Sequence, residues 1–66
     1  EGKPDLRYYE DDTLRMQTVY ASPTVYTETL FFDGGFSVET TYVNHNKTLE
    51  VILLNGQEQR RRSFAD

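Results

Sequence analysis

The stretch from Thr24 to Val43, TVYTETLFFDGGFSVETTYV, decides the fold of this 66-residue chain. It is rich in valine, threonine and aromatic residues, which favour β-strands, on both sides of Asp33-Gly34-Gly35. A three-residue loop with glycine is typical of a β-hairpin, because glycine adopts a positive φ at little cost. This loop predicts three cross-strand pairs on one face, namely Phe32 with Phe36, Leu30 with Val38, and Tyr26 with Tyr42.

Two further runs of alternating residues precede this hairpin. Leu6–Tyr9 predicts a short strand, and Thr13–Tyr20 predicts a longer one. The acidic triplet Glu10-Asp11-Asp12 lies between them and favours a turn, because aspartate bonds to the nearby backbone. Pro23 ends the second run, since proline cannot donate a hydrogen bond to a sheet.

A fifth run, Thr48–Leu54, follows the hairpin. We expect a four-residue loop at Asn44-His45-Asn46-Lys47 to connect it to the preceding strand. A loop of that length places Leu49, Val51 and Leu53 on the same apolar face as the hairpin pairs. The register matters because a slip of one residue would turn this whole set to the opposite face.

The last segment, Gln57–Phe64, breaks the apolar pattern. Asn55-Gly56 predicts a tight two-residue turn before it. The turn would then direct Glu58, Arg60 and Arg62 toward the apolar face. We expect an exposed edge strand here, where charges prevent edge-to-edge aggregation, with a short polar helix as the alternative.

The sequence therefore predicts an all-β fold, an antiparallel meander of five to six strands. Residues 6–64 would form a single small β domain, and residues 1–5 a flexible N-terminal tail. The apolar face of a single sheet must be covered. We expect the sheet to curl into a small barrel or to pack face to face in an oligomer. The chain begins at Glu1 and not at methionine, so a fragment of a larger protein is a further alternative.

Composition narrows the classes of function. The net charge of −4 argues against a non-specific nucleic-acid binder. The chain has no run of 18 apolar residues, so we expect no membrane span. It also has no cysteine, which excludes disulfides and thiolate metal sites and slightly favours a cytoplasmic location that is otherwise undetermined.

Catalytic chemistry has little support in the residues. An enzyme needs convergent groups such as a nucleophile and a base, and His45 is the only histidine. Glu10, Asp11 and Asp12 are consecutive, whereas calcium loops place their ligands at alternate positions. We therefore expect no catalytic residue, no metal site and no cofactor, and we interpret the protein as a non-enzyme.

Glu28 is the exception on the predicted apolar face. A buried carboxylate is costly unless it is paired or hydrogen-bonded. One interpretation is an ion pair with Arg60 or Arg62. The other is a polar group that orients a ligand in a cavity.

The second face of the predicted sheet is mixed, and four apolar residues on it form a candidate partner-binding patch. They are Phe31, Val43, Ile52 and Leu54. Partial cover by the chain termini, including Phe64, is the alternative interpretation.

These features support a non-catalytic protein–protein binding or assembly module that presents a sheet face or edge. Its simplest partner is a second copy, which would make a homo-oligomer. The alternative is a small β-barrel that binds single-stranded nucleic acid through Arg60, Arg61, Arg62 and aromatic residues. A further alternative is a curled meander that binds a small apolar ligand.

Overall fold

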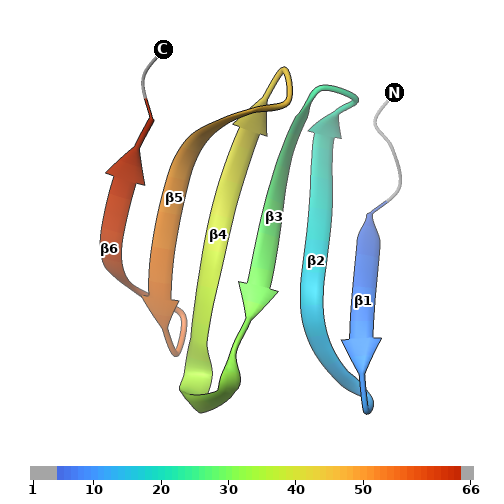
Figure 1. Ribbon diagram of the computed structural model, residues 1–66, viewed down its shortest axis with the longest axis vertical. Helices are drawn as coiled ribbons and strands as arrows, with labels where there is room; N and C mark the ends of the chain where they lie inside the picture. The colour runs from blue at the N-terminus through green and yellow to red at the C-terminus, as the bar shows by residue number, and fades with distance from the viewer. Residues whose placement is uncertain (1–4, 65–66) are drawn as a thin grey trace.

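The computed structural model describes residues 5–64, and these form one six-stranded antiparallel sheet in chain order (Figure 1). The prediction of an all-β antiparallel meander is confirmed, as is a strand rather than a helix after Gly56. The expected tail lies outside the described residues, apart from Asp5. The strands are β1 (Leu6–Glu10), β2 (Thr13–Ser22), β3 (Val25–Phe31), β4 (Phe36–Val43), β5 (Asn46–Leu54) and β6 (Gln57–Ser63).

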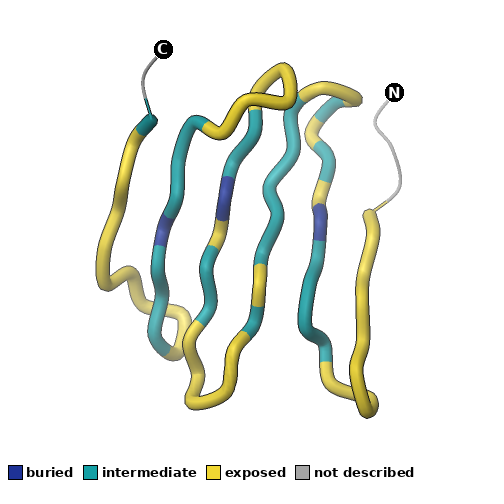
Figure 2. The backbone as a smooth tube through the Cα atoms, viewed as in Figure 1, coloured by how far each residue is buried: buried dark blue, intermediate teal, exposed yellow. Residues whose placement is uncertain are grey.

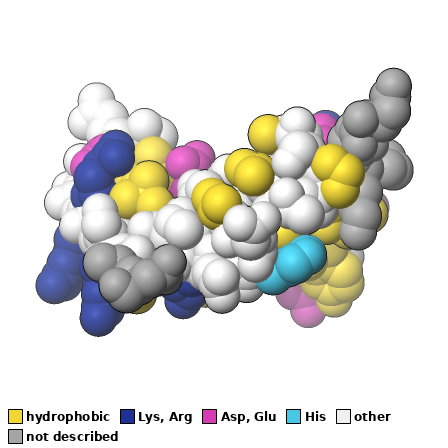
Figure 3. All heavy atoms as spheres, turned by 90° about the horizontal axis from the view of Figure 1, so that it is seen from above, with side chains coloured by type: hydrophobic (Ala, Val, Ile, Leu, Met, Phe, Trp, Pro, Cys, Tyr) yellow, Lys and Arg dark blue, Asp and Glu magenta, His cyan; other side chains and the backbone are white. Residues whose placement is uncertain are grey.

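The sheet is open, so the prediction of a closed barrel is wrong. β1 and β6 lie at opposite edges of a body that measures 32 by 27 by 14 Å (Figures 1 and 3). A barrel needs strands that tilt and stagger in register. Here Met16, Leu30, Val38 and Ile52 lie side by side across four strands, so the hairpins add almost no stagger. The sheet is therefore a single layer.

Three of the connections are two-residue turns with a positive φ at both residues. They are Asp11-Asp12 (51° and 62°), Asn44-His45 (53° and 67°) and Asn55-Gly56 (52° and 83°). This conformation matches the natural twist of a hairpin. The expected four-residue loop at 44–47 is wrong, because Val43 already pairs with Asn46.

The tighter turn alone moves the register of β5 by two residues, which would keep the predicted face. A β-bulge between Thr41 and Tyr42 follows it, and Val38 then lies opposite Ile52 instead of Leu53. As a result Leu49, Val51 and Leu53 lie on the face opposite to the predicted one. A second register shift, between Ile52 and Leu53, affects β6. It places Arg60 opposite Ile52 and Arg62 opposite Glu50.

The register defines two faces, each named here after its central residues. Opposed residues of neighbouring strands share a face. The tyrosine face carries Leu6, Tyr8, Met16, Thr18, Tyr20, Tyr26, Glu28, Leu30, Phe36, Val38, Thr40, Tyr42, Lys47, Glu50, Ile52, Leu54, Arg60 and Arg62. The threonine face carries Arg7, Gln17, Val19, Val25, Thr27, Thr29, Phe31, Ser37, Glu39, Thr41, Val43, Leu49, Val51, Leu53, Arg61 and Ser63.

A single layer encloses very few side chains. Only Thr18, Thr40 and Val51 are buried among the described residues, each on an inner strand (Figure 2). Large apolar side chains stay exposed on both faces, including Leu30 at 37% and Val19 at 40%. Cross-strand contacts between half-exposed neighbours therefore supply most of the packing.

The loops at each end of the sheet are tied to one another. At one end the Asn55 N–H donates to the carbonyl of Gly35 (2.8 Å), and at the other the Asn44 N–H donates to the carbonyl of Thr24 (2.8 Å). The Asn55 side chain lies against Gly35 so closely that a Cβ there would overlap its Oδ1. Gly35 also has a φ of 85°, which favours glycine.

We expect Gly35→Ala to lower the free energy of unfolding more than Gly34→Ala does. Both glycines have a positive φ, but a Cβ at Gly34 meets nothing closer than 3.8 Å. The shared backbone strain costs about 1–2 kcal/mol, and the overlap with Asn55 should add at least ~1 kcal/mol. Urea unfolding of the two variants measures the difference, and equal losses would show that the contact between the loops is unimportant.

Candidate functional site: the tyrosine face

Three tyrosines from adjacent strands form a row near one end of the tyrosine face. The ring centroids of Tyr20 and Tyr26 are 5.0 Å apart, and those of Tyr26 and Tyr42 are also 5.0 Å apart and nearly parallel. The Tyr26 hydroxyl lies 3.2 Å from Nδ1 of His45. These contacts hold the three rings in place. The row therefore provides an aromatic surface and no catalytic group.

Tyr42 has the most strongly altered environment of the row. Burial raises the pKa of its hydroxyl above the ordinary value of 10.0, and the nearby carboxylates of Glu28 and Glu50 add to the rise. The folded sheet therefore stabilises the neutral phenol of Tyr42 relative to the phenolate.

A polar row crosses the middle of the same face, next to the tyrosines. Glu28 lies between Thr18 and Thr40, and Glu50 lies on the far side of Thr40. Both threonines are buried. Glu28 thus projects from the centre of the sheet, where any surface that covers this face would meet it.

The interpretation of Glu28 as the partner of an arginine of β6 is wrong. β4 and β5 lie between them, which separates their backbones by roughly 14 Å, or three strand spacings. Within residues 5–64, the salt bridges join Arg15 to Glu10 and Asp33, and Arg61 to Glu58. Glu28 therefore has no ion pair with any of the residues that the structure describes.

The three arginines of β6 do not form one cluster. Arg60 and Arg62 lie on the tyrosine face, where they border a shallow pocket of about 160 Å³ with Glu50 and Ile52. Arg61 lies on the threonine face and donates two hydrogen bonds to Glu58 (3.0 and 2.8 Å). These bonds lower the pKa of the Glu58 carboxyl, so the charge of Arg61 is already paired.

A cationic border runs along the β5–β6 side of the tyrosine face. Lys47 and Arg62 both lie over the ring of Phe64, at 5.2 and 5.1 Å from its centroid. Arg60 continues the border along β6. Figure 3 shows Lys and Arg side chains gathered at this end of the sheet. The sequence indicated only the three arginines, because Lys47 joins them through the tight turn before β5.

The four residues predicted as a partner-binding patch are divided between the faces. Phe31 and Val43 lie on the threonine face, whereas Ile52 opposes Val38 and Leu54 opposes Phe36 on the tyrosine face. The unexpected register of β5 causes this division. Ile52 instead joins Val38, Leu30 and Met16 in an apolar row.

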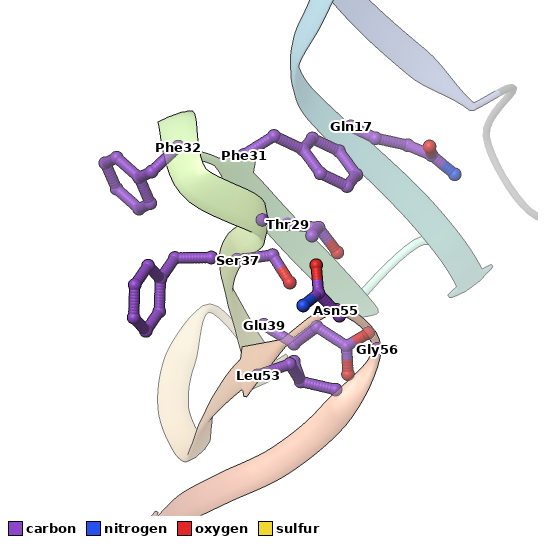
Figure 4. Close-up of a pocket in the computed structure, with 11 residues that line it drawn as sticks. Gln17, Thr29, Phe31, Phe32, Ser37, Glu39, Leu53, Asn55 and Gly56 are labelled. Carbon is purple, nitrogen blue, oxygen red and sulfur yellow. The ribbon is translucent and has the colours of Figure 1, made fainter.

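The threonine face holds a broad open groove of about 560 Å³ near the β3–β4 loop. Side chains of Thr29, Ser37, Glu39 and Asn55 point toward this space, and Phe31 lies beside it (Figure 4). Sequence reasoning missed the groove because it depends on loops that meet only in the folded sheet.

Residues 5–64 include no group of three side chains that could hold a metal ion. No helix in that range is long and apolar enough to cross a membrane. Comparison with family models, curated proteins and solved structures finds no match for this chain.

We expect stability to fall at alkaline pH partly through Tyr42. Its pKa is raised in the folded state, so its contribution is fully present below pH 10.0 and is lost as the pH rises through the folded-state value. Tyr42→Phe should therefore reduce the alkaline loss of stability, measured by thermal unfolding as a function of pH. Tyr8→Phe, at an exposed position of the same face, controls for loss of a hydroxyl. An unchanged alkaline loss in Tyr42→Phe would contradict this account.

Proposed function

We propose that the chain is a non-catalytic assembly module whose tyrosine face is covered by a second copy. The observation that carries the proposal is a single-layer sheet whose apolar side chains have no second layer to pack against. Chains of this size are only marginally stable even with a closed core. A second copy supplies the missing layer and buries the exposed apolar area.

The two central strands favour the tyrosine face over the threonine face. On β3 and β4 the tyrosine face presents four large apolar or aromatic side chains, Tyr26, Leu30, Val38 and Tyr42. The threonine face presents hydroxyl and carboxylate groups at most of the intervening positions, Thr27, Thr29, Ser37, Glu39 and Thr41. Threonine pairs on a solvated sheet face need no cover, whereas a central apolar patch does.

The size of the face also fits a second copy. The two long dimensions of the sheet, 32 and 27 Å, enclose roughly 860 Å², close to the ~800 Å² per partner of a standard interface. Two such sheets would form a sandwich about 10 Å thick between their backbones.

A second candidate function is the binding of single-stranded nucleic acid on the same face. Lys47 ends the tyrosine row, and Arg60 and Arg62 continue the cationic border beside it. Stacking rings beside cations are the features such sites use. Glu28 and Glu50 lie in the adjacent row and would repel phosphates, which makes this the weaker candidate.

Leu30→Lys and Val19→Lys form a matched test of the assembly proposal. The two residues have similar exposure, 37% and 40%, but lie on opposite faces. A lysine at Leu30 would be buried against the second copy, so we expect the dissociation constant of the dimer to rise at least about tenfold, or ~1.4 kcal/mol. Val19→Lys should leave it nearly unchanged.

Sedimentation velocity across protein concentration measures both dissociation constants. Equal effects of the two lysines, or a wild-type chain that stays monomeric, would contradict cover of the tyrosine face by a second copy.

For nucleic acid, the double variant Arg60→Gln/Arg62→Gln is matched by Arg61→Gln. If this face binds a single-stranded oligonucleotide, fluorescence anisotropy at low salt should detect a complex that the double variant loses and Arg61→Gln retains. No binding by the wild-type chain at low salt would eliminate this candidate.

A further inference from the structure

We infer that the two copies are related by a two-fold axis that runs parallel to the strands, between β3 and β4. This inference rests on the proposed function and adds the geometry of the interface. The axis reverses strand order, so β1 of one copy lies over β6 of the second, β2 over β5, and β3 over β4. Closed two-fold symmetry is the commonest arrangement of homo-oligomers.

Rotation about this axis places the apolar row of one copy over the apolar row of the second copy. Met16 on β2 meets Ile52 of the second copy, and Leu30 on β3 meets Val38 of the second copy. In the neighbouring row Tyr26 meets Tyr42 of the second copy. The most apolar positions of both sheets therefore bury one another near the axis.

The same operation places every charge of the face opposite an uncharged or aromatic side chain. Arg60 meets Tyr8 of the second copy and Lys47 meets Tyr20, which permits cation–π contacts. Glu28 meets Thr40 of the second copy, and Glu50 likewise meets Thr18, so each carboxylate faces a hydroxyl donor. No like charges oppose one another.

Two other arrangements of the copies bring like charges together. A two-fold axis perpendicular to the strands, through the polar row, stacks Glu28 on Glu28 and Glu50 on Glu50 of the second copy. On the threonine face, the axis parallel to the strands stacks Arg7 on Arg61 of the second copy. Opposed like charges cost several kcal/mol at an interface. Charge complementarity thus favours the tyrosine face with the parallel axis over these two arrangements.

Cross-linking between two single-cysteine variants tests this geometry, because the chain has no native cysteine. Met16→Cys mixed with Ile52→Cys should give a cross-linked dimer when treated with a short bifunctional methanethiosulfonate reagent. Each variant alone should give none, since Met16 and Met16 of the second copy lie three strands apart in this arrangement. Tyr20→Cys mixed with Lys47→Cys is a second pair with the same three-strand separation, in case one of the first variants does not fold.

The outcomes separate the inference from the proposed function. Cross-linking in the mixtures but in neither variant alone supports the parallel axis. Self-cross-linking of one variant, or no cross-linking while sedimentation still reports a dimer, would overturn the geometry and leave the assembly proposal standing. A monomer at all concentrations would overturn both.

Discussion

Cross-strand pairing is the interaction on which this whole structure depends. Most sheets are held together from outside, by a second layer that buries one face. Here six strands lie in one layer, and of residues 5–64 only Thr18, Thr40 and Val51 are buried. The register of the strands therefore determines which residues pair across the sheet and which side chains each face presents to a partner. A one-residue bulge between two strands therefore changes which side chains each face presents.

The sequence predicts the fold class, and the part with the strongest turn signal is right in detail. Asp33-Gly34-Gly35 correctly predicts the pairs of Leu30 with Val38 and of Tyr26 with Tyr42, because glycine marks the positive φ. The predicted pair of Phe32 and Phe36 lies beyond the last pair of the ladder, where the two residues share one backbone hydrogen bond. Asn44-His45 forms a two-residue turn like that of Asn55-Gly56, with a positive φ at both residues. It contains no glycine, so no simple signal in the sequence distinguishes it from a longer loop. The register shifts between Thr41 and Tyr42 and between Ile52 and Leu53 also have no marker in the sequence. The sheet does not close into a barrel because the register of neighbouring strands has almost no stagger.

The shifted register changes how the unusual residues are understood. An arginine partner for Glu28 is one of two interpretations that the sequence offers, yet Glu28 lies between two threonines at the centre of the tyrosine face. Arg61 is paired on the other face, and Arg60 and Arg62 form the border of the tyrosine face with Lys47. The tyrosine face then combines the central carboxylates, the cationic border and the row of tyrosines in one self-complementary surface. The sequence alone did not reveal this combination.

Static light scattering of the unmodified chain over a wide concentration range tests the central claim most directly. The account predicts a mass that rises from 7.7 kDa to twice that value, with a melting temperature that increases as the dimer forms. A mass of 7.7 kDa throughout, with stability independent of concentration, would contradict the claim that a second copy covers the tyrosine face.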